Sequence, residues 1–175
     1  MEFHIETERL LLRHMLPTDI EDMFELDSDH DVHRYLGNKA FTTKKQSEAY
    51  INDVIEQYRT FGIGRWAMIN KQTHEFMGWS GLKYYTKPMN GHVNFYDVGY
   101  RIIKRFWGKG YATESAKAVL DYGLNTMNLN TIYGITHQEN DASHHVLLKI
   151  GLNYIEDFYD EDLQMQLRWY NISKS

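Results

Sequence analysis

The residues whose types and spacing are best suited to chemistry form one stretch, Trp107-Gly108-Lys109-Gly110-Tyr111-Ala112-Thr113-Glu114. An extended run with alternating apolar residues, 94–103, precedes it, and a helical pattern of small and apolar residues, 112–127, follows it. Glycines leave backbone N–H groups uncovered, and a helix start adds free N–H donors and partial positive charge. This order predicts a site for phosphate or pyrophosphate. An ordinary glycine turn is the alternative on these residues alone.

A second polar group, Asn140-Asp141-Ala142-Ser143, opens the last predicted helix. The amide of Asn140 can both donate and accept, which suits a ligand rich in amides, although helix capping explains Asn140 and Ser143 equally well. The nine histidines include one dense cluster, Asp29-His30-Asp31-x-His33, but no His-Glu-x-x-His motif. The sequence therefore predicts no metal site.

The hydrophobic pattern predicts one α+β domain around a mixed sheet that positions these groups. Two helices come first, each beginning at a capping-box pattern, Thr18–Glu21 and Thr43–Gln46. Three antiparallel strands follow, with a bulge or close backbone approach at Gly78 and Gly81. A helical crossover then makes the next strand parallel to its predecessor. The predicted strands are 6–14, 63–70, 75–85, 92–102, 131–136, 152–159 and 163–170.

Composition excludes several classes of protein. The chain has 175 residues, no Cys, and a formal net charge of −5 without any long Lys/Arg cluster. These features exclude disulfides and a Cys nucleophile, and they predict neither nucleic-acid nor membrane binding. No apolar run approaches the ~20 residues that span a bilayer. The first residues lack the pattern of a secretory signal, so we expect a cytoplasmic protein.

Several blocks in this order resemble the GNAT acyl-CoA N-acyltransferases, and most closely the Rim-type (ribosomal-protein N-acetyltransferase-like) branch. They are the glycine loop with its flanking strand and helix, the Asn140-x-x-Ser143 site, Thr7-Glu8-Arg9-Leu10-x-Leu12-Arg13, and Val98-Gly99-Tyr100-Arg101-Ile102. The resemblance covers nearly the whole chain. It implies a single GNAT-like domain over 1–175, with a mixed, mostly antiparallel central sheet flanked by helices.

The resemblance also implies acetyl-CoA as co-substrate. The phosphate-loop pattern Gln/Arg-x-x-Gly-x-Gly/Ala maps onto Trp107-x-x-Gly110-x-Ala112, with Trp107 in place of Gln or Arg. A second frame, Arg105-x-x-Gly108-x-Gly110, fits the letters but places the loop two residues earlier. The implied acetyl-CoA-binding residues are Tyr100, Arg101, Ile102, Trp107, Gly108, Lys109, Gly110, Tyr111, Ala112, Thr113, Asn140 and Ser143.

Catalytic roles follow from the same resemblance. The family often has a Tyr acid on the last helix, where this chain has Leu147, and Ser143 is the proposed substitute. Asp97 stands where Rim-type sequences often have an acidic residue, and it is the candidate general base, acting through water. A surface carboxylate, or an ion pair with Arg101, is the alternative for Asp97.

The resemblance thus implies transfer of an acetyl group from acetyl-CoA to a primary amine by direct attack in a ternary complex. The acceptor is left open between a protein N-terminus and a small molecule, and we allow for a homodimer. The alternative is a CoA-binding sensor or interaction module without turnover. ATP binding is disfavoured because the Gly-x-x-x-x-Gly-Lys-Ser/Thr frame is missing.

Overall fold

A computed structural model describes residues 2–175. Within these residues an eight-stranded sheet has the order β1-β2-β3-β4-β5-β6-β8-β7. Every neighbouring pair of described strands is antiparallel except β5 and β6, which are parallel as predicted. The strands are β1 (His4–Glu6), β2 (Leu10–Arg13), β3 (Arg65–Asn70), β4 (Phe76–Tyr85), β5 (Phe95–Ile102), β6 (Thr131–His137), β7 (Asn153–Asp160) and β8 (Met165–Ser173). The predicted fold class, α+β with a mixed and mostly antiparallel sheet, is confirmed.

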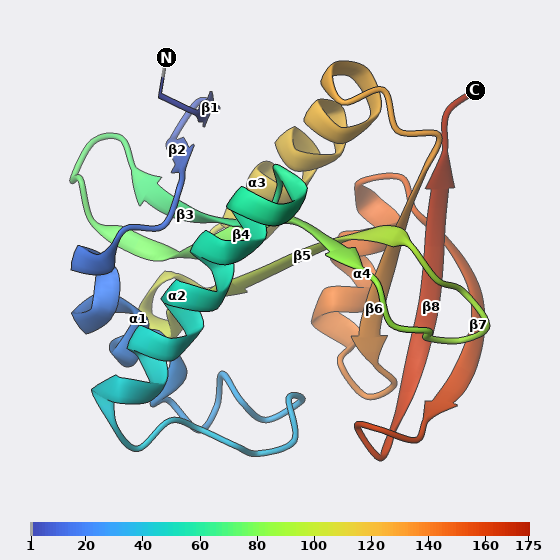
Figure 1. The fold of residues 1–175 in the computed structure, drawn as a ribbon, viewed down its shortest axis with the longest axis horizontal. Coiled ribbons are helices and arrows are strands. Elements are labelled where there is room, and N and C mark those ends of the chain that lie inside the picture. The colour runs from blue at the N-terminus through green and yellow to red at the C-terminus, as the bar shows by residue number, and fades with distance from the viewer. Residues whose placement is uncertain (1) are drawn as a thin grey trace.

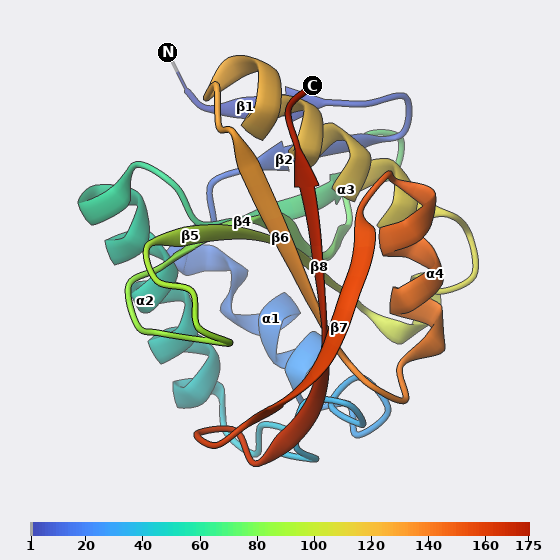
Figure 2. The ribbon, with the colours of Figure 1, turned by 90° about the vertical axis from the view of Figure 1, so that its right-hand side faces the viewer.

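Helices cover both faces of the sheet. The longer helices are α1 (Ile20–Asp27), α2 (Lys44–Phe61), α3 (Tyr111–Asp121) and α4 (Asp141–Lys149). Helices α1 and α2 lie on one face, and α3 and α4 lie on the other (Figures 1 and 2). A buried apolar cluster that includes Trp66, Met68, Leu82, Val119 and Ile132 joins the sheet to these helices. No helix in the described part of the chain is long and apolar enough to cross a membrane.

The two predicted capping boxes have different outcomes. At α2 the prediction is confirmed, since Oε1 of Gln46 accepts the amide N–H of Thr43 at 3.0 Å. At α1 the prediction is wrong: the buried carboxylate of Asp19 accepts the amide of Leu16 at 2.8 Å and pairs with Arg13. The helical entry is therefore capped through Asp19 and Leu16, not through Thr18 and Glu21, and Asp19 also neutralises Arg13 on β2.

Two predicted elements also differ in extent. The predicted strand 6–14 is divided into β1 and β2 by a turn, in which the amide of Thr7 donates to the carbonyl of Leu10 at 2.9 Å. The predicted helix 112–127 ends as the π-helical turn Tyr122–Thr126. There Gly123 packs so closely on β6 that an added Cβ would lie 2.6 Å from Cδ1 of Ile132. The predicted irregularity at Gly78 is confirmed, since the β3–β4 register shifts beside it.

Candidate active site

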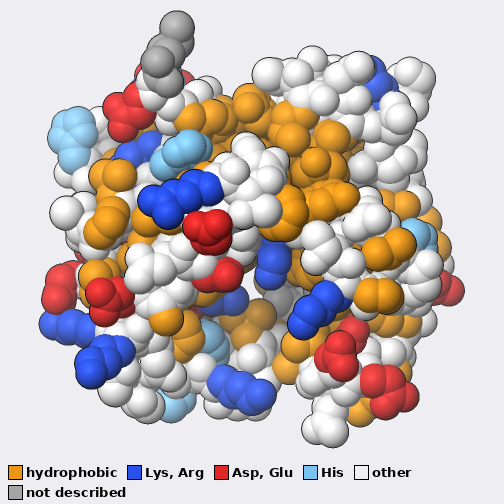
Figure 3. Space-filling view, viewed as in Figure 1, with side chains coloured by type: hydrophobic (Ala, Val, Ile, Leu, Met, Phe, Trp, Pro, Cys, Tyr) orange, Lys and Arg blue, Asp and Glu red, His pale blue; other side chains and the backbone are white. Residues whose placement is uncertain are grey.

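One cavity of about 1030 Å³ lies where β5 and β6 separate. Register pairing between these strands ends at Val98 and Gly134, although β5 continues to Ile102. A hollow also marks the centre of the face that Figure 3 shows. The cavity is lined by Asp97 and by all the predicted acetyl-CoA-binding residues except Lys109: Tyr100, Arg101, Ile102, Trp107, Gly108, Gly110, Tyr111, Ala112, Thr113, Asn140 and Ser143.

The free edge of β5 supplies backbone groups to this cavity. The amide of Ile103 donates to the carbonyl of Met77 on the β4 side at 2.9 Å. Because successive residues of a strand point their N–H and C=O groups to alternate sides, those of Tyr100 and Ile102 face the gap. The indole N–H of Trp107 donates a hydrogen bond to the carbonyl of Ile102 at 2.7 Å, so this carbonyl is already paired. The backbone groups of Tyr100 and the N–H of Ile102 are therefore the ones that face an incoming ligand.

The glycine loop leads directly into α3. Gly108 and Gly110 have φ of 72° and 82°, a conformation that L side chains rarely adopt. Gly110 is the N-cap residue, and the amide of Glu114 donates to its carbonyl at 3.1 Å. Among the described residues, the amides of Tyr111, Ala112 and Thr113 find no backbone acceptor. These free donors at a helix start form a site that favours an anion.

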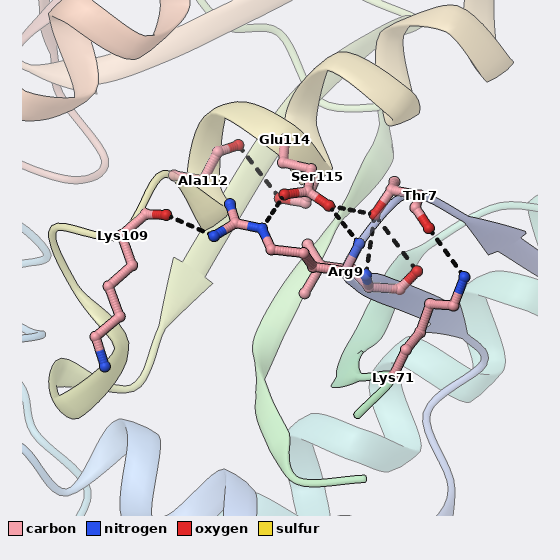
Figure 4. Close-up of polar contacts among 8 residues, drawn as sticks. Thr7, Arg9, Lys71, Lys109, Ala112, Glu114 and Ser115 are labelled. Carbon is pink, nitrogen blue, oxygen red and sulfur yellow. Dashed lines mark hydrogen bonds and ion pairs between the residues drawn. The ribbon is translucent and has the colours of Figure 1, made fainter. Parts of the chain in front are cut away.

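The turn between β1 and β2 holds this loop from outside. Arg9 donates Nε to Oε2 of Glu114 at 2.7 Å and Nη1 to the carbonyl of Lys109 at 3.0 Å. The hydroxyl of Thr7 donates to Oε1 of Glu114 at 2.6 Å. Figure 4 shows Arg9 between the Lys109 carbonyl and the Glu114 carboxylate. Thr7 and Arg9, from the block on which the family resemblance partly rests, therefore hold the loop at Lys109 and at Glu114.

Glu114 is ionised as part of this contact. Burial alone would raise its pKa, but hydrogen bonds from Thr7 and from the backbone and side chain of Arg9 lower it. A lowered pKa means that the ionised carboxylate stabilises the folded chain above the ordinary pKa of 4.5, and that this stabilisation is lost as the pH falls through the lowered value. The loop is therefore held firmly at neutral pH.

We expect Arg9→Ala to raise the KM for acetyl-CoA about tenfold with little change in kcat. Arg9 touches the loop from the side away from the cavity, and a lost hydrogen bond to a charged group costs about 1.5–3 kcal/mol. The matched control is Lys71→Ala, because Lys71 Nζ donates to the Thr7 carbonyl at 3.1 Å but does not contact the loop. Initial rates at varied acetyl-CoA measure the effect. Equal KM values in both variants would contradict the role of Arg9.

Asp97 is buried, so the alternative interpretation of it, as a surface carboxylate or an ion pair with Arg101, is wrong. Its Oδ1 lies 2.9 Å from Nη2 of Arg65, which is itself buried. Burial raises the pKa of Asp97, and Arg65 opposes that shift. Gly99 leaves room for the guanidinium, since an added Cβ would lie 2.8 Å from Nη2 of Arg65. Asp97 thus has a buried, cavity-lining carboxylate that forms an ion pair with Arg65.

Arg101 pairs instead with Asp27 at the end of α1. Its Nη1 lies 2.7 Å from Oδ1 of Asp27, and Nε2 of His33 lies 2.8 Å from the same oxygen. The guanidinium groups of Arg65 and Arg101 each lie 5.1 Å from the ring of Trp79. This places two arginines and an aromatic ring on the α1/α2 side of the cavity.

The α3/α4 side holds Tyr100 and Ser143. Burial raises the pKa of Tyr100 to about 12, and the neighbouring Ser143 hydroxyl opposes that shift. Tyr100 is therefore protonated at neutral pH. Oδ1 of Asn140 accepts the amide of Ser143 at 3.2 Å, so Asn140 caps α4. Leu147 is buried and lines the cavity, so an apolar side chain occupies the position of the family's usual Tyr.

Lys109 is the one predicted acetyl-CoA-binding residue that does not line the cavity. Its ammonium group lies 3.4 Å from the carbonyl of Arg105 and 5.9 Å from the ring centre of Phe106. The carbonyl of Lys109 contributes to the site, because it accepts a hydrogen bond from Nη1 of Arg9. Within residues 2–175, no group of three or more His, Asp or Glu side chains is arranged to hold a metal ion.

Within residues 2–175 the sheet separates at its one parallel pair, beside a helix start with free amides, and this α+β arrangement suits an extended phosphorylated ligand. Residues 9–153 match the acetyltransferase (GNAT) domain. The chain belongs to the GNAT acetyltransferase family. It is 32% identical to "Uncharacterized protein YkkB" of Bacillus subtilis over 85% of this chain and 84% of that protein. It is 29% identical to "Uncharacterized N-acetyltransferase YoaA" of the same organism, over 84% and 81%.

Solved structures agree with this assignment. A GNAT-family acetyltransferase from Bacillus anthracis has 27% identity and a TM-score of 0.79, covering 98% of both chains. Spermidine N-acetyltransferase from Vibrio cholerae, solved with CoA and spermine, has 18% identity and a TM-score of 0.74, covering 95% of this chain and 96% of that chain. At that identity the second comparison shows a shared fold alone.

Proposed function

We propose that this protein transfers an acetyl group from acetyl-CoA to a primary amine by direct attack in a ternary complex. One observation carries the proposal: the cavity joins both faces of the sheet at the β5–β6 gap. Thr113 and Ser143 line it from the α3/α4 side, and Trp79, which stacks on Tyr50 of α2, lines it from the other side. Two substrates can thus approach each other from opposite faces without exchanging places.

The donor side fits acetyl-CoA. The free amides of Tyr111, Ala112 and Thr113 would hold the pyrophosphate, with Gly108 and Gly110 leaving their approach open. The backbone groups of Tyr100 and the N–H of Ile102 would hold the amides of the pantetheine arm as an added strand does. Bound there, acetyl-CoA supplies the activated acetyl group. The remaining predicted contacts, including Asn140 and Lys109, belong to this proposal.

Two side chains have proposed proton-transfer roles. Asp97 accepts the proton of the amine through water, since its carboxylate is buried, lines the cavity and has a raised pKa. Ser143 donates a proton to the departing sulfur, since the side chain of Leu147 has no proton to donate. The protonated phenol of Tyr100 lines the same side of the cavity as Ser143.

Thiol release from acetyl-CoA with a panel of amines tests the proposal. The proposal is supported if thiol release depends on an added amine and if an acetylated product of the expected mass forms. Binding of CoA without turnover across a broad panel would favour the sensor or interaction module. Leu147 keeps that alternative open, because it replaces the family's usual acid with an apolar group. Thermal stabilisation by ATP but not by CoA would overturn both.

We expect Asp97→Asn to make the fall of kcat/KM toward low pH less steep, because only protonation of the amine would still contribute to it. A base works only when ionised, so activity should fall as the pH drops through the pKa of Asp97, which burial raises. The limb that comes from protonation of the amine is the same in both enzymes and serves as the internal control. An unaltered profile with the same acceptor would dismiss Asp97 as the base.

Three finer points are also part of this proposal. Membership in the Rim-type branch has support from the contact between Arg9 and Glu114, which gives the branch's N-terminal block a role in the loop. A cytoplasmic location and a homodimer stay predictions from the sequence. Gel filtration with light scattering tests the homodimer.

A further inference from the structure

The cavity has an end on the α1/α2 face that the donor substrate would not fill. We call it the acceptor chamber. Its walls come from β4, the β4–β5 turn, the α1–α2 segment and the β7–β8 turn. The acceptor chamber is lined by Tyr35, Trp79, Tyr85, Met89, Leu163 and Met165. Aromatic and Met side chains offer contact area to planar and apolar ligands.

The α1–α2 segment, residues 28–43, closes the chamber on one side. The ring of Tyr35 lies 5.5 Å from the ring of His137 on β6. A Cβ added at Gly37 would lie 3.0 Å from Cε of Met165 on β8. The amides of Leu36 and Asn38 both donate to the carbonyl of His33 at 3.0 Å, which fixes the segment. The segment therefore reaches across to β6 and β8, and it limits the space that a long peptide would need on this side of the chamber.

Charge in the chamber disfavours a polycation. Two carboxylates line the cavity, and each has a cationic partner: Asp97 pairs with Arg65, and Asp31 pairs with Lys104. Three arginines, Arg34, Arg65 and Arg101, line the same cavity. Among the residues that line the cavity, arginines outnumber carboxylates, so a polyamine would bring several positive charges close to other positive charges.

We propose that the acceptor is a compact molecule with one primary amine on an aromatic or otherwise apolar body, and not a polyamine or a protein N-terminus. This inference rests on the proposed function and specifies its second substrate. In the reaction the amine nitrogen forms a bond to the acetyl carbon while the C–S bond breaks. The amine loses one proton to solvent through the base, the thiolate gains one, and the products are an N-acetyl amine and CoA thiol.

The test compares three acceptors at saturating acetyl-CoA: phenethylamine, spermidine and a ten-residue peptide with a free N-terminus. We expect kcat/KM for phenethylamine to be at least about tenfold higher than for the other two, the range that pocket contacts commonly give. Preference for spermidine or the peptide would overturn the acceptor class and leave acetyl transfer standing. No turnover with any of them, or with a wider amine panel, would overturn the proposed function too.

A charge inserted in the chamber gives an independent check. Leu163 is 51% exposed and lines the cavity, whereas Leu148 on α4 is 41% exposed and does not. We expect Leu163→Glu to lower kcat/KM for phenethylamine about tenfold and to raise it for spermidine, while Leu148→Glu changes neither. The KM for acetyl-CoA should be the same in both variants. If Leu163→Glu and the unaltered protein have the same acceptor preference, Leu163 does not contact the acceptor.

Discussion

Gly110→Asp should abolish the binding of CoA in a protein that still folds. Gly110 is the N-cap residue of α3, and the nearest described atom to an added Cβ, Nη2 of Arg9, lies 3.5 Å away. Asp is among the best N-cap residues and tolerates positive φ better than most, so the fold should survive. Its carboxylate would accept hydrogen bonds from the free amides of α3 and repel phosphate from the same place. We expect affinity to fall at least about 100-fold, or about 2.7 kcal/mol.

Gly110→Asn is the matched control for this prediction. Asn has nearly the same shape as Asp, caps helices as well and tolerates the same backbone conformation, but it carries no charge. The difference between the two variants therefore isolates repulsion of the phosphates from backbone strain at φ 82°. Calorimetric titration with CoA gives the affinities, and thermal melts show that both variants fold. Unchanged CoA affinity in folded Gly110→Asp would refute the assignment of the loop.

Local patterns in the sequence were enough to predict most of the fold. The 3.6-residue period of Lys44–Phe61 and the Gln46 cap defined α2, and the crossover through α3 predicted the parallel pair β5–β6. The errors occur where a distant contact overrides a local pattern. Asp19 replaces the predicted cap because it also pairs with Arg13, and the helix after Asp121 widens into a π-turn where Gly123 packs on Ile132.

The candidate site was predictable where it depends on backbone conformation. Glycines at 108 and 110 before a helix start indicate free amides whatever surrounds them. The contacts that hold these groups in place join residues far apart in the chain. Arg9 and Glu114 are 105 positions apart, and Arg65 and Asp97 are 32 apart. No periodicity or motif indicates which arginine meets which carboxylate. Sequence proximity therefore offered Arg101 only as an alternative partner for Asp97, and the structure pairs Asp97 with Arg65.

Arg65→Met should destabilise the protein more than any exposed substitution does. Arg65 is buried and pairs with Asp97, and its Nη1 also donates to the carbonyls of Gly81 at 2.8 Å and Asp97 at 3.2 Å. Met fills much of the same volume but leaves the buried carboxylate without a partner. Breaking a buried ion pair in this way costs about 3–5 kcal/mol. In a domain of this size we expect the melting temperature to fall by about 10 °C.

The double variant Arg65→Met/Asp97→Asn separates loss of the ion pair from loss of packing. With the carboxylate replaced by a neutral amide, no unpaired charge remains in the interior, so much of the lost stability should return. Denaturant unfolding of both single variants and the double variant measures the coupling energy between the two side chains. Because Asp97 is also the proposed base, the double variant should recover stability without recovering acetyl transfer. Additive losses in the double variant would mean that Arg65 does not stabilise the buried charge, and recovery of activity would mean that Asp97 is not the base.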